Sequence, residues 1–319
     1  MILAVALNAA LDVTYRVPTL EPGRTHRIEH VITRAGGKGL NVARVLHARG
    51  EEVVALAFAG GATGAEIADR LAAAGIAAEL VPTDGASRRT VAIHDDGCTT
   101  GLWEPGPTVR TAEWEALEAR FRLLAGRAAV VVLAGSLPPG VPGDAYRRLT
   151  LAARHAGAPV VLDADSAALG HGLDAEPDVV KPNAGELSAA TGRPAGTPAE
   201  ALAAARILRA DRRTAVVASL GPAGIVAHTA AGDFHAAPPE ALPGNPTGAG
   251  DAAVAALAAG LARGLTWPEL LADAVALSAA AVSAPAAGEL DARTAARVRA
   301  AVTVVPFEGE TRRAADADR

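Results

Sequence analysis

Short apolar runs alternate with alanine-rich helical stretches along most of this chain, and this alternation restricts the fold most. Nearly unbroken apolar character predicts buried strands at 2–7, 52–60, 128–135, 159–165, 178–183 and 214–221. The stretches between them predict helices at 39–50, 64–75, 143–157 and 198–210. Strands that alternate with helices of this length form a parallel sheet covered on both faces. The sequence therefore predicts an α/β fold, a three-layer αβα sandwich with a mostly parallel central sheet.

Two segments, about 12–33 and 87–103, depart from this rhythm. Apolar and polar residues alternate within them, as expected for a half-solvated antiparallel sheet. We expect them to form a small β-sheet lid that projects from the α/β body. Residues 1–308 are expected to form a single domain, and 309–319, which have almost no apolar content, a frayed tail.

Charge and cysteine content exclude several classes of function. The net charge is −5, the pI is about 5.9, and no block of like charges occurs, which argues against a nucleic-acid or membrane partner. The single cysteine, Cys98, can form neither an internal disulfide nor a cysteine-rich metal site, and this fits a reducing cytosol. The apolar opening lacks a basic n-region and reaches Asp12 early, so a buried strand is favoured over a signal peptide. We expect a cytoplasmic protein.

Lysine and asparagine are rare and are confined to a few motifs. Of 30 basic side chains, Lys38 and Lys181 are the only lysines. The four asparagines, Asn8, Asn41, Asn183 and Asn245, lie in the motifs NAALD, GGKGLN, KPNAGE and GNPTGAGD, two of which also hold the lysines. Asparagine is common in turns, which explains any one of them. Their joint occurrence with the lysines favours a binding site, because an ammonium point charge is not replaced by a guanidinium.

The stretch GNPTGAGD, which precedes an apolar helical run, is typical of an anion site. Gly248, Ala249 and Gly250 leave backbone N–H groups open at a helix N-terminus, where partial positive charge stabilises anions. Asp251 follows in the first turn. We expect the helix field to keep it ionised, so that it can accept a proton from an attacking hydroxyl. An ordinary helix cap is the alternative.

Two further motifs follow predicted strands. In KPNAGE, the cation Lys181, the amide Asn183 and the carboxylate Glu186 suit nucleotide phosphates and water-bound magnesium, although a capped, solvated turn would need the same residues. In SLGPAG, the segment from Ser219 through Gly221 to Gly224 could lie against a nucleotide or form a glycine turn.

The loop AGGKGLN opens a helix that carries Lys38 and Asn41 but matches neither the P-loop nor the dinucleotide pattern. Ser136 stands at a strand end without a suitably spaced histidine, so a turn is favoured there over a nucleophile. His30, His94 and His228 fall in expected strands, where core or lid positions are commoner than metal ligation.

In order and spacing, GGKGLNVARVL, GSLPPG, KPNAGEL, SLGPAG and GNPTGAGD resemble the PfkB (ribokinase-like) carbohydrate kinases. The resemblance covers roughly residues 1–305, and the combination of GGKGxN with GAGD is highly specific. NAALDVTYRV and EPGPTV are most similar to the branch of 1-phosphofructokinases and tagatose-6-phosphate kinases.

The resemblance implies a role for each matching residue. Asp251 would be the proton acceptor, with Gly248, Ala249 and Gly250 as the anion hole. The sugar would be held by Asp12, Gly36, Gly37, Lys38 and Asn41, with Arg27 and Arg88 as basic lid residues. Ser136, in the shared GSLPPG, is counted with the substrate-binding candidates. ATP would meet Lys181, Asn183, Ser219, Gly221, Gly224 and Gly250, and Mg2+ would be associated with Asn183 and Glu186, through water.

Three departures from the branch pattern occur, of which the last concerns the sugar side of the lid. Ala9 stands where proline is usual, Pro246 replaces a Thr or Ser, and SRRT replaces Thr-Arg-x-Asn, so that Thr90 lacks the expected amide.

We therefore expect an ATP-dependent kinase of a ketohexose monophosphate, whose phosphate meets Arg27, Lys38 and Arg88. The alternatives are a kinase of an unphosphorylated sugar or nucleoside, and a catalytically silent sugar-binding relative. A homodimer that pairs through the lid edges is also expected.

Overall fold

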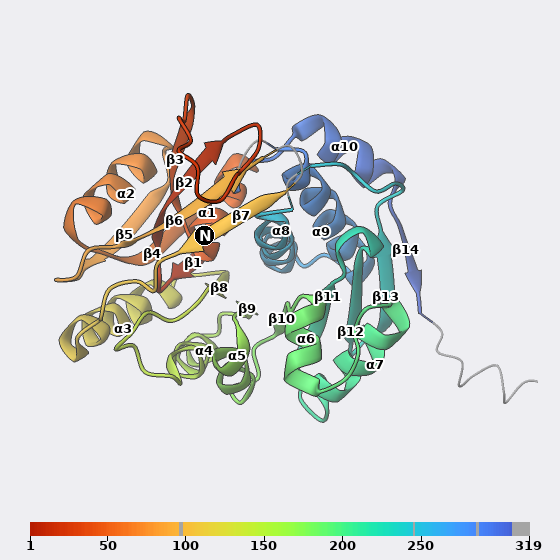
Figure 1. Cartoon of the computed structure of the whole chain (residues 1–319). Helices are drawn as coiled ribbons and strands as arrows, with labels where there is room; N and C mark the ends of the chain where they lie inside the picture. Colours follow the sequence, from red (N-terminus) through yellow and green to blue (C-terminus); the bar gives the residue numbers. More distant parts are fainter. Residues whose placement is uncertain (96–97, 245, 285–286, 308–319) are drawn as a thin grey trace, which may run out of the picture.

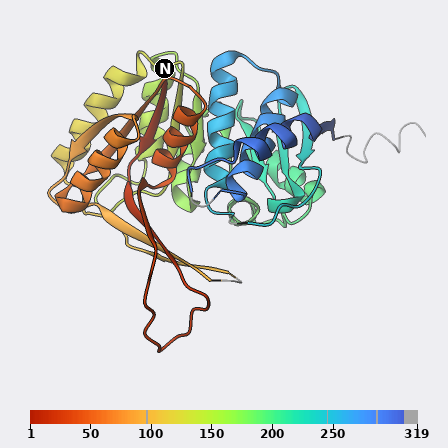
Figure 2. The ribbon, with the colours of Figure 1, turned by 90° about the horizontal axis from the view of Figure 1, so that it is seen from above.

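The computed structural model describes residues 1–95, 98–244, 246–284 and 287–307. Asn245 and the tail expected at 309–319 lie outside the described residues. The body and the projecting lid are visible in two orthogonal views (Figures 1 and 2). No helix within the described ranges is both long enough and apolar enough to cross a membrane.

A ten-stranded sheet forms the centre of the body, in the order β14-β13-β12-β11-β10-β9-β8-β1-β4-β5. From β5 to β11 every pair of neighbours is parallel, whereas β12, β13 and β14 are added antiparallel. The strands are β1 Ile2–Ala6, β4 Val53–Ala59, β5 Ala77–Pro82, β8 Val130–Ala134, β9 Val160–Asp163, β10 Val179–Val180, β11 Ala215–Ser219, β12 Ile225–Thr229, β13 Gly232–Ala237 and β14 Thr303–Pro306. All six strands predicted from sequence are confirmed.

Helices cover both faces of this sheet, which confirms the predicted αβα sandwich (Figure 1). One apolar core lies between the sheet and α1 Lys38–Ala48, α2 Gly61–Ala73, α8 Ala249–Arg263, α9 Trp267–Val282 and α10 Ala292–Ala301. The other core lies beneath α3 Thr111–Ala125, α4 Ala145–His155, α5 Ser166–Leu173, α6 Ala184–Thr191 and α7 Pro198–Arg209. Because both faces are buried, the parallel strands are apolar at nearly every position.

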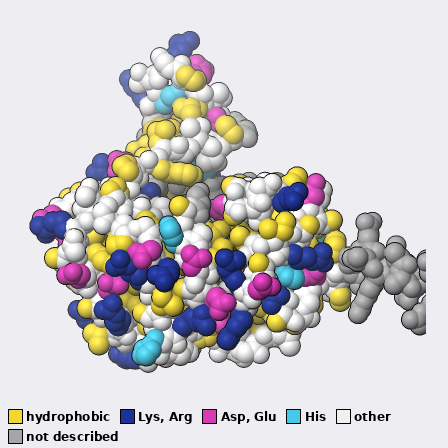
Figure 3. Space-filling view, turned by 90° about the horizontal axis from the view of Figure 1, so that it is seen from below, with side chains coloured by type: hydrophobic (Ala, Val, Ile, Leu, Met, Phe, Trp, Pro, Cys, Tyr) yellow, Lys and Arg dark blue, Asp and Glu magenta, His cyan; other side chains and the backbone are white. Residues whose placement is uncertain are grey.

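A separate four-stranded sheet, in the order β3-β2-β6-β7, forms the lid. Its strands are β2 Ala10–Arg16, β3 Val31–Gly36, β6 Arg88–His94 and β7 Thr99–Trp103. They rise from the body, and apolar side chains are exposed on them (Figure 3); Val31 and Leu102 are among the exposed residues. The expected pairing of two lids stays a prediction.

The lid differs from the sequence expectation in two places. Its central pair, β2 with β6, is parallel, whereas an antiparallel sheet was expected. Residues 26–30, including His30, form no strand, because the pairing of β2 with β3 stops at Tyr15 and Val31. Pro18, soon after β2, has no N–H to continue a ladder. His94 and His228 do lie in strands, β6 and β12.

Candidate active site

A cleft of about 880 Å³ lies between the lid and the carboxyl ends of the central strands, and nearly all predicted site residues line it. Ligands of open α/β sheets bind at this edge. The lining includes the predicted residues Asp12, Gly37, Lys38, Asn41, Arg88, Ser136, Lys181, Asn183, Glu186, Ser219, Gly221, Gly224, Gly248, Ala249, Gly250 and Asp251. Of the predicted residues, Arg27 and Gly36 do not line it.

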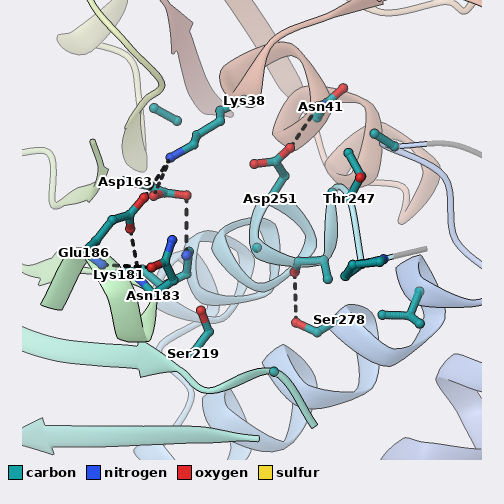
Figure 4. Close-up of a pocket in the computed structure, with 18 of the residues that line it drawn as sticks. Lys38, Asn41, Asp163, Lys181, Asn183, Glu186, Ser219, Thr247, Asp251 and Ser278 are labelled. Carbon is teal, nitrogen blue, oxygen red and sulfur yellow. Dashed lines mark hydrogen bonds and ion pairs between the residues drawn. The ribbon is translucent and has the colours of Figure 1, made fainter. Parts of the chain in front are cut away.

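The N-terminus of α8 forms one wall of the cleft. Gly248 precedes the helix with a φ of 88°, and a Cβ there would lie 3.0 Å from the Cα of Ala287, so glycine is required by both conformation and space. Asp251 is the third residue of the helix and is buried, and the Asn41 amide donates to its Oδ2 at 2.8 Å (Figure 4). The Ala249 N–H donates to the carbonyl of Pro246 at 3.1 Å. The backbone N–H groups at the start of α8 and the buried Asp251 carboxylate therefore share one helix turn.

The protonation of Asp251 differs from the sequence expectation. Burial and, secondly, the Asp163 carboxylate raise its pKa to about 7, against the opposing effects of Asn41, Lys38 and Lys181. The prediction that the helix field keeps this acid ionised is wrong, because desolvation outweighs that field. Near pH 7 the carboxylate is poised between its two forms, which is the range that suits a general base.

The sugar half of the cleft is built around Asp12, in the middle of β2. Thr90, opposite it on β6, donates to its carboxylate, and the N–H of Gly37 donates as well. Burial raises the pKa of Asp12, although these hydrogen bonds, Arg88 and Arg44 lower it. A Cβ on Gly36 would lie 1.9 Å from Asp12 Oδ2. Gly36 therefore acts by leaving room for this carboxylate.

Arg88, on β6, connects the lid to the body. Its Nε donates to the carbonyl of Asn8 at 3.2 Å and its Nη1 to the carbonyl of Glu104 at 3.1 Å. The Asn8 side chain in turn donates to Ser136 Oγ at 3.0 Å. Asn8 thus connects Arg88 with Ser136, two predicted substrate-binding residues. The rarity of asparagine in the sequence suggested a role for Asn8 but not these contacts.

The predicted basic cluster of Arg27, Lys38 and Arg88 does not form. Arg27 is exposed in the loop between β2 and β3, away from the cleft. The Lys38 ammonium contacts three carboxylates, at 2.8 Å from Asp165, 3.3 Å from Asp163 and 3.7 Å from Glu186. Arg27 therefore does not line the cleft, and Lys38 is paired with carboxylates, while a contact of a substrate phosphate with these residues stays a prediction.

Asp163 and Asp165 are functional candidates that the sequence reading missed. They end β9 and follow it, in the stretch LDAD, which was interpreted only as strand. Their position at a strand's carboxyl end was the signal that could have found them. Thr90 and Trp103, which also line the cleft, gave no such signal.

On the nucleotide half, Asn183 and Glu186 cap α6. Asn183 Oδ1 accepts from the Glu186 N–H at 2.9 Å, and Glu186 Oε2 accepts from the Asn183 N–H at 2.9 Å. The helix cap that was the alternative explanation for Asn183 and Glu186 is therefore present, and both residues also line the cleft. Lys181 is buried, with its ammonium 3.5 Å from Asp163 Oδ2.

The SLGPAG turn lies beside this half of the cleft. Ser219 ends β11, and a short 3-10 turn, Gly221–Ala223, follows. A Cβ on Gly224 would lie 2.1 Å from the carbonyl oxygen of Ala236. The glycine at 224 is therefore explained by the close approach of β13, whatever else it contacts.

A cleft between a β-lid and the carboxyl ends of parallel strands, with a helix N-terminus in its wall, agrees with the resemblance to carbohydrate kinases. The model of the pfkB family of carbohydrate kinases matches residues 2–294. The chain belongs to this family, and it is an ATP-dependent sugar kinase.

Solved structures agree with this assignment. Phosphofructokinase-2 from Escherichia coli, in complex with fructose-6-phosphate, is 28% identical, with a TM-score of 0.86 over 94% of this chain and 98% of that one. A possible 1-phosphofructokinase from Thermotoga maritima is 24% identical, with a TM-score of 0.84 over 96% and 99%. Arabidopsis thaliana ribokinase, complexed with ribose and ATP, is 20% identical, with a TM-score of 0.72 over 93% and 98%. The last two show the shared fold.

Proposed function

We propose that the protein transfers the γ-phosphoryl group of ATP to a free hydroxyl of a ketohexose monophosphate, giving a bisphosphate. One observation carries this proposal: a buried carboxylate, Asp251, faces the cleft from the first turn of α8, whose residues Gly248 to Gly250 also line the cleft. The phosphofructokinases among the similar structures support the substrate class.

In this proposal Asp251 removes the proton from the sugar hydroxyl as the hydroxyl attacks. The backbone N–H groups of Gly248, Ala249 and Gly250 hold the oxygens of the migrating phosphoryl group, where charge develops. Asn41 orients the base, because its amide binds the Asp251 carboxylate. Asp12, in the lid, holds the sugar hydroxyls.

Magnesium fits this cleft as a hydrated ion. In the described part of the chain no group of three His, Cys, Asp or Glu side chains is placed to hold a metal directly. The Glu186 carboxylate and the Asn183 amide, at the edge of the cleft, offer the oxygen ligands that Mg2+ accepts through water. When bound, the ion would neutralise phosphate charge on the nucleotide.

A kinase of an unphosphorylated sugar is the second candidate, and one observation favours it. Arg27 and Lys38 do not join Arg88, so one cation remains from the predicted phosphate-binding cluster. ATP consumption with fructose 1-phosphate, tagatose 6-phosphate, fructose 6-phosphate, ribose and adenosine separates the two. We expect the highest kcat/KM with a ketohexose phosphate, and a clear preference for ribose or adenosine would reject the proposal.

We expect Arg88→Ala to raise the KM for the sugar phosphate about tenfold or more, with a smaller effect on kcat. A hydrogen bond to a charged group contributes roughly 1.5–3 kcal/mol, and about 1.4 kcal/mol corresponds to tenfold. Arg89→Ala is the matched control, because Arg89 is the next residue on β6, points to the opposite face and does not line the cleft. Equal KM values for the two variants would show that no substrate phosphate lies near Arg88.

The activity should also depend on the protonation of Asp251. Its folded-state pKa of about 7 is above its ordinary value, so the ionised, active form is lost as the pH falls through 7. We expect kcat/KM for the sugar to fall about tenfold per pH unit on the acid side of this value. Steady-state rates between about pH 5.5 and 9 measure this, and a profile without an acid limb near 7 would contradict the role of Asp251.

A further inference from the structure

Asp163 is the most deeply buried acid of the cleft, and the proposed phosphoryl transfer does not yet use it. It is the last residue of β9, and its side chain is 3% exposed. A carboxylate is costly to bury unless it is paired. The role of Asp163 therefore depends on the charged side chains that contact it.

Each oxygen of Asp163 contacts one lysine. Oδ1 lies 3.3 Å from the Lys38 ammonium, and Oδ2 lies 3.5 Å from the Lys181 ammonium (Figure 4). These are the only two lysines in the sequence, whose other basic side chains are all arginine. Both of the chain's lysines therefore contact the same buried carboxylate.

Arginine would not serve at these positions. A guanidinium forms two parallel bonds and so tends to occupy both oxygens of a carboxylate, whereas an ammonium is a compact point charge. One carboxylate can therefore be shared by two ammoniums that come from different elements, here the start of α1 and the end of β10. The sequence retains lysine where this sharing requires it.

The shared carboxylate also fixes where the two charges lie. The Lys181 ammonium is 3.4 Å from the position that a Cβ on Gly250 would take, so it lies against the first turn of α8. Lys38 is the first residue of α1, the helix that carries Asn41 and thereby the hydrogen bond to Asp251. Both ammoniums are thus held next to the elements of the proposed transfer.

We propose that Asp163 is a positioning residue of the phosphoryl transfer, because it holds both ammoniums beside the start of α8. Its negative charge also acts on the Asp251 carboxylate. This inference rests on the proposed function, in which Asp251 is the base.

The groups that face Asp251 set the sign of this effect. They are Asn41 and Lys38 from α1, Asp163 from β9 and Lys181 after β10. The amide and the two ammoniums favour the ionised form of Asp251, whereas Asp163 disfavours it. Without the charge of Asp163, two unopposed ammoniums would make Asp251 a weaker base.

The test is the protonation midpoint of the Asp251 carboxyl group, measured by infrared spectroscopy on the nucleotide-free full-length protein. The band is assigned by its loss in Asp251→Asn. We expect Asp163→Asn to lower the midpoint by about one pH unit or more, and kcat to fall with it. We expect Lys181→Met to raise the midpoint, because one stabilising positive charge is removed.

Asp165→Asn is the matched control. Asp165 also contacts Lys38, at 2.8 Å, but it is half exposed, so solvent screens its charge more than that of buried Asp163. Its removal should leave the midpoint where it is in the wild type. An unchanged midpoint in Asp163→Asn would overturn the proposal, even if activity were lost, because a merely structural role would have that result.

If Asp163→Asn fails to fold, the midpoint is measured in Asp163→Ser, and an unchanged midpoint there overturns the proposal. These midpoints need no turnover. They therefore remain readable if Asp251→Asn keeps its activity, a result that would reject the proposed base and leave the effect of Asp163 on Asp251 to be judged separately.

Discussion

Asp251→Asn is expected to fold normally and to lose at least about a hundredfold in kcat, because a positioned general base contributes roughly 10²–10⁴-fold. The folded structure should tolerate the change, since an amide has nearly the same shape and its oxygen can still accept from Asn41. The uncharged side chain also removes the cost of burying a carboxylate. Initial rates under saturating ATP and sugar, with circular dichroism to confirm folding, test this.

Glu269→Gln is the matched control for this variant. Glu269 is also the third residue of a helix, α9, where its carboxylate accepts from the N–H and the hydroxyl of Thr266 outside the cleft. Its loss should weaken a helix cap without changing kcat. If Asp251→Asn were as active as Glu269→Gln, Asp251 would be a capping residue of the same kind.

Gly36→Ala should lower kcat/KM for the sugar about a hundredfold or more, since misplacing a reacting group by about 1 Å can cost that much. The new Cβ would lie 1.9 Å from Asp12 Oδ2, so the carboxylate must leave its hydrogen bonds with Thr90 and Gly37. Because φ at Gly36 is ordinary, the effect is a collision with a side chain and not backbone strain.

Gly143→Ala provides the comparison. Its Cβ would meet nothing within 4 Å, and φ is again ordinary. Both variants add one methyl group, so a difference between their kcat/KM values reports the displacement of Asp12. Sugar affinity that survives Gly36→Ala would show that Asp12 does not hold the sugar.

The architecture was largely predictable because parallel strands buried on both faces must be apolar at almost every position. Helix α9 was not assigned, since it is buried on most sides and its alanine-rich sequence shows little helical periodicity. The strand expected at 26–33 begins only at Val31, because alternation cannot reveal how far a partner strand extends.

The candidate site was predictable where one short motif contains both its backbone and its side chains. The GAGD motif predicts both the start of a helix and the position of Asp251 in its first turn. The side-chain contacts that surround the charged groups of the site were not predictable, because they join residues far apart in the sequence. Lys38 and Asp163 are 125 positions apart, and Asn41 and Asp251 are 210 apart. The pairing of Lys38 with carboxylates was missed for this reason, whereas the raised pKa of Asp251 was missed because the sequence does not show how deeply this side chain is buried.

The most direct test of Asp251 as the general base is a crystal structure with magnesium, a non-hydrolysable ATP analogue and the sugar phosphate of highest kcat/KM. If Asp251 is the base, we expect a free sugar hydroxyl within about 2.6–3.2 Å of its carboxylate and the terminal phosphoryl group against the N–H groups of Gly248 to Gly250. A terminal phosphoryl group bound away from the start of α8, or a hydroxyl that approaches another side chain as its base, would contradict it.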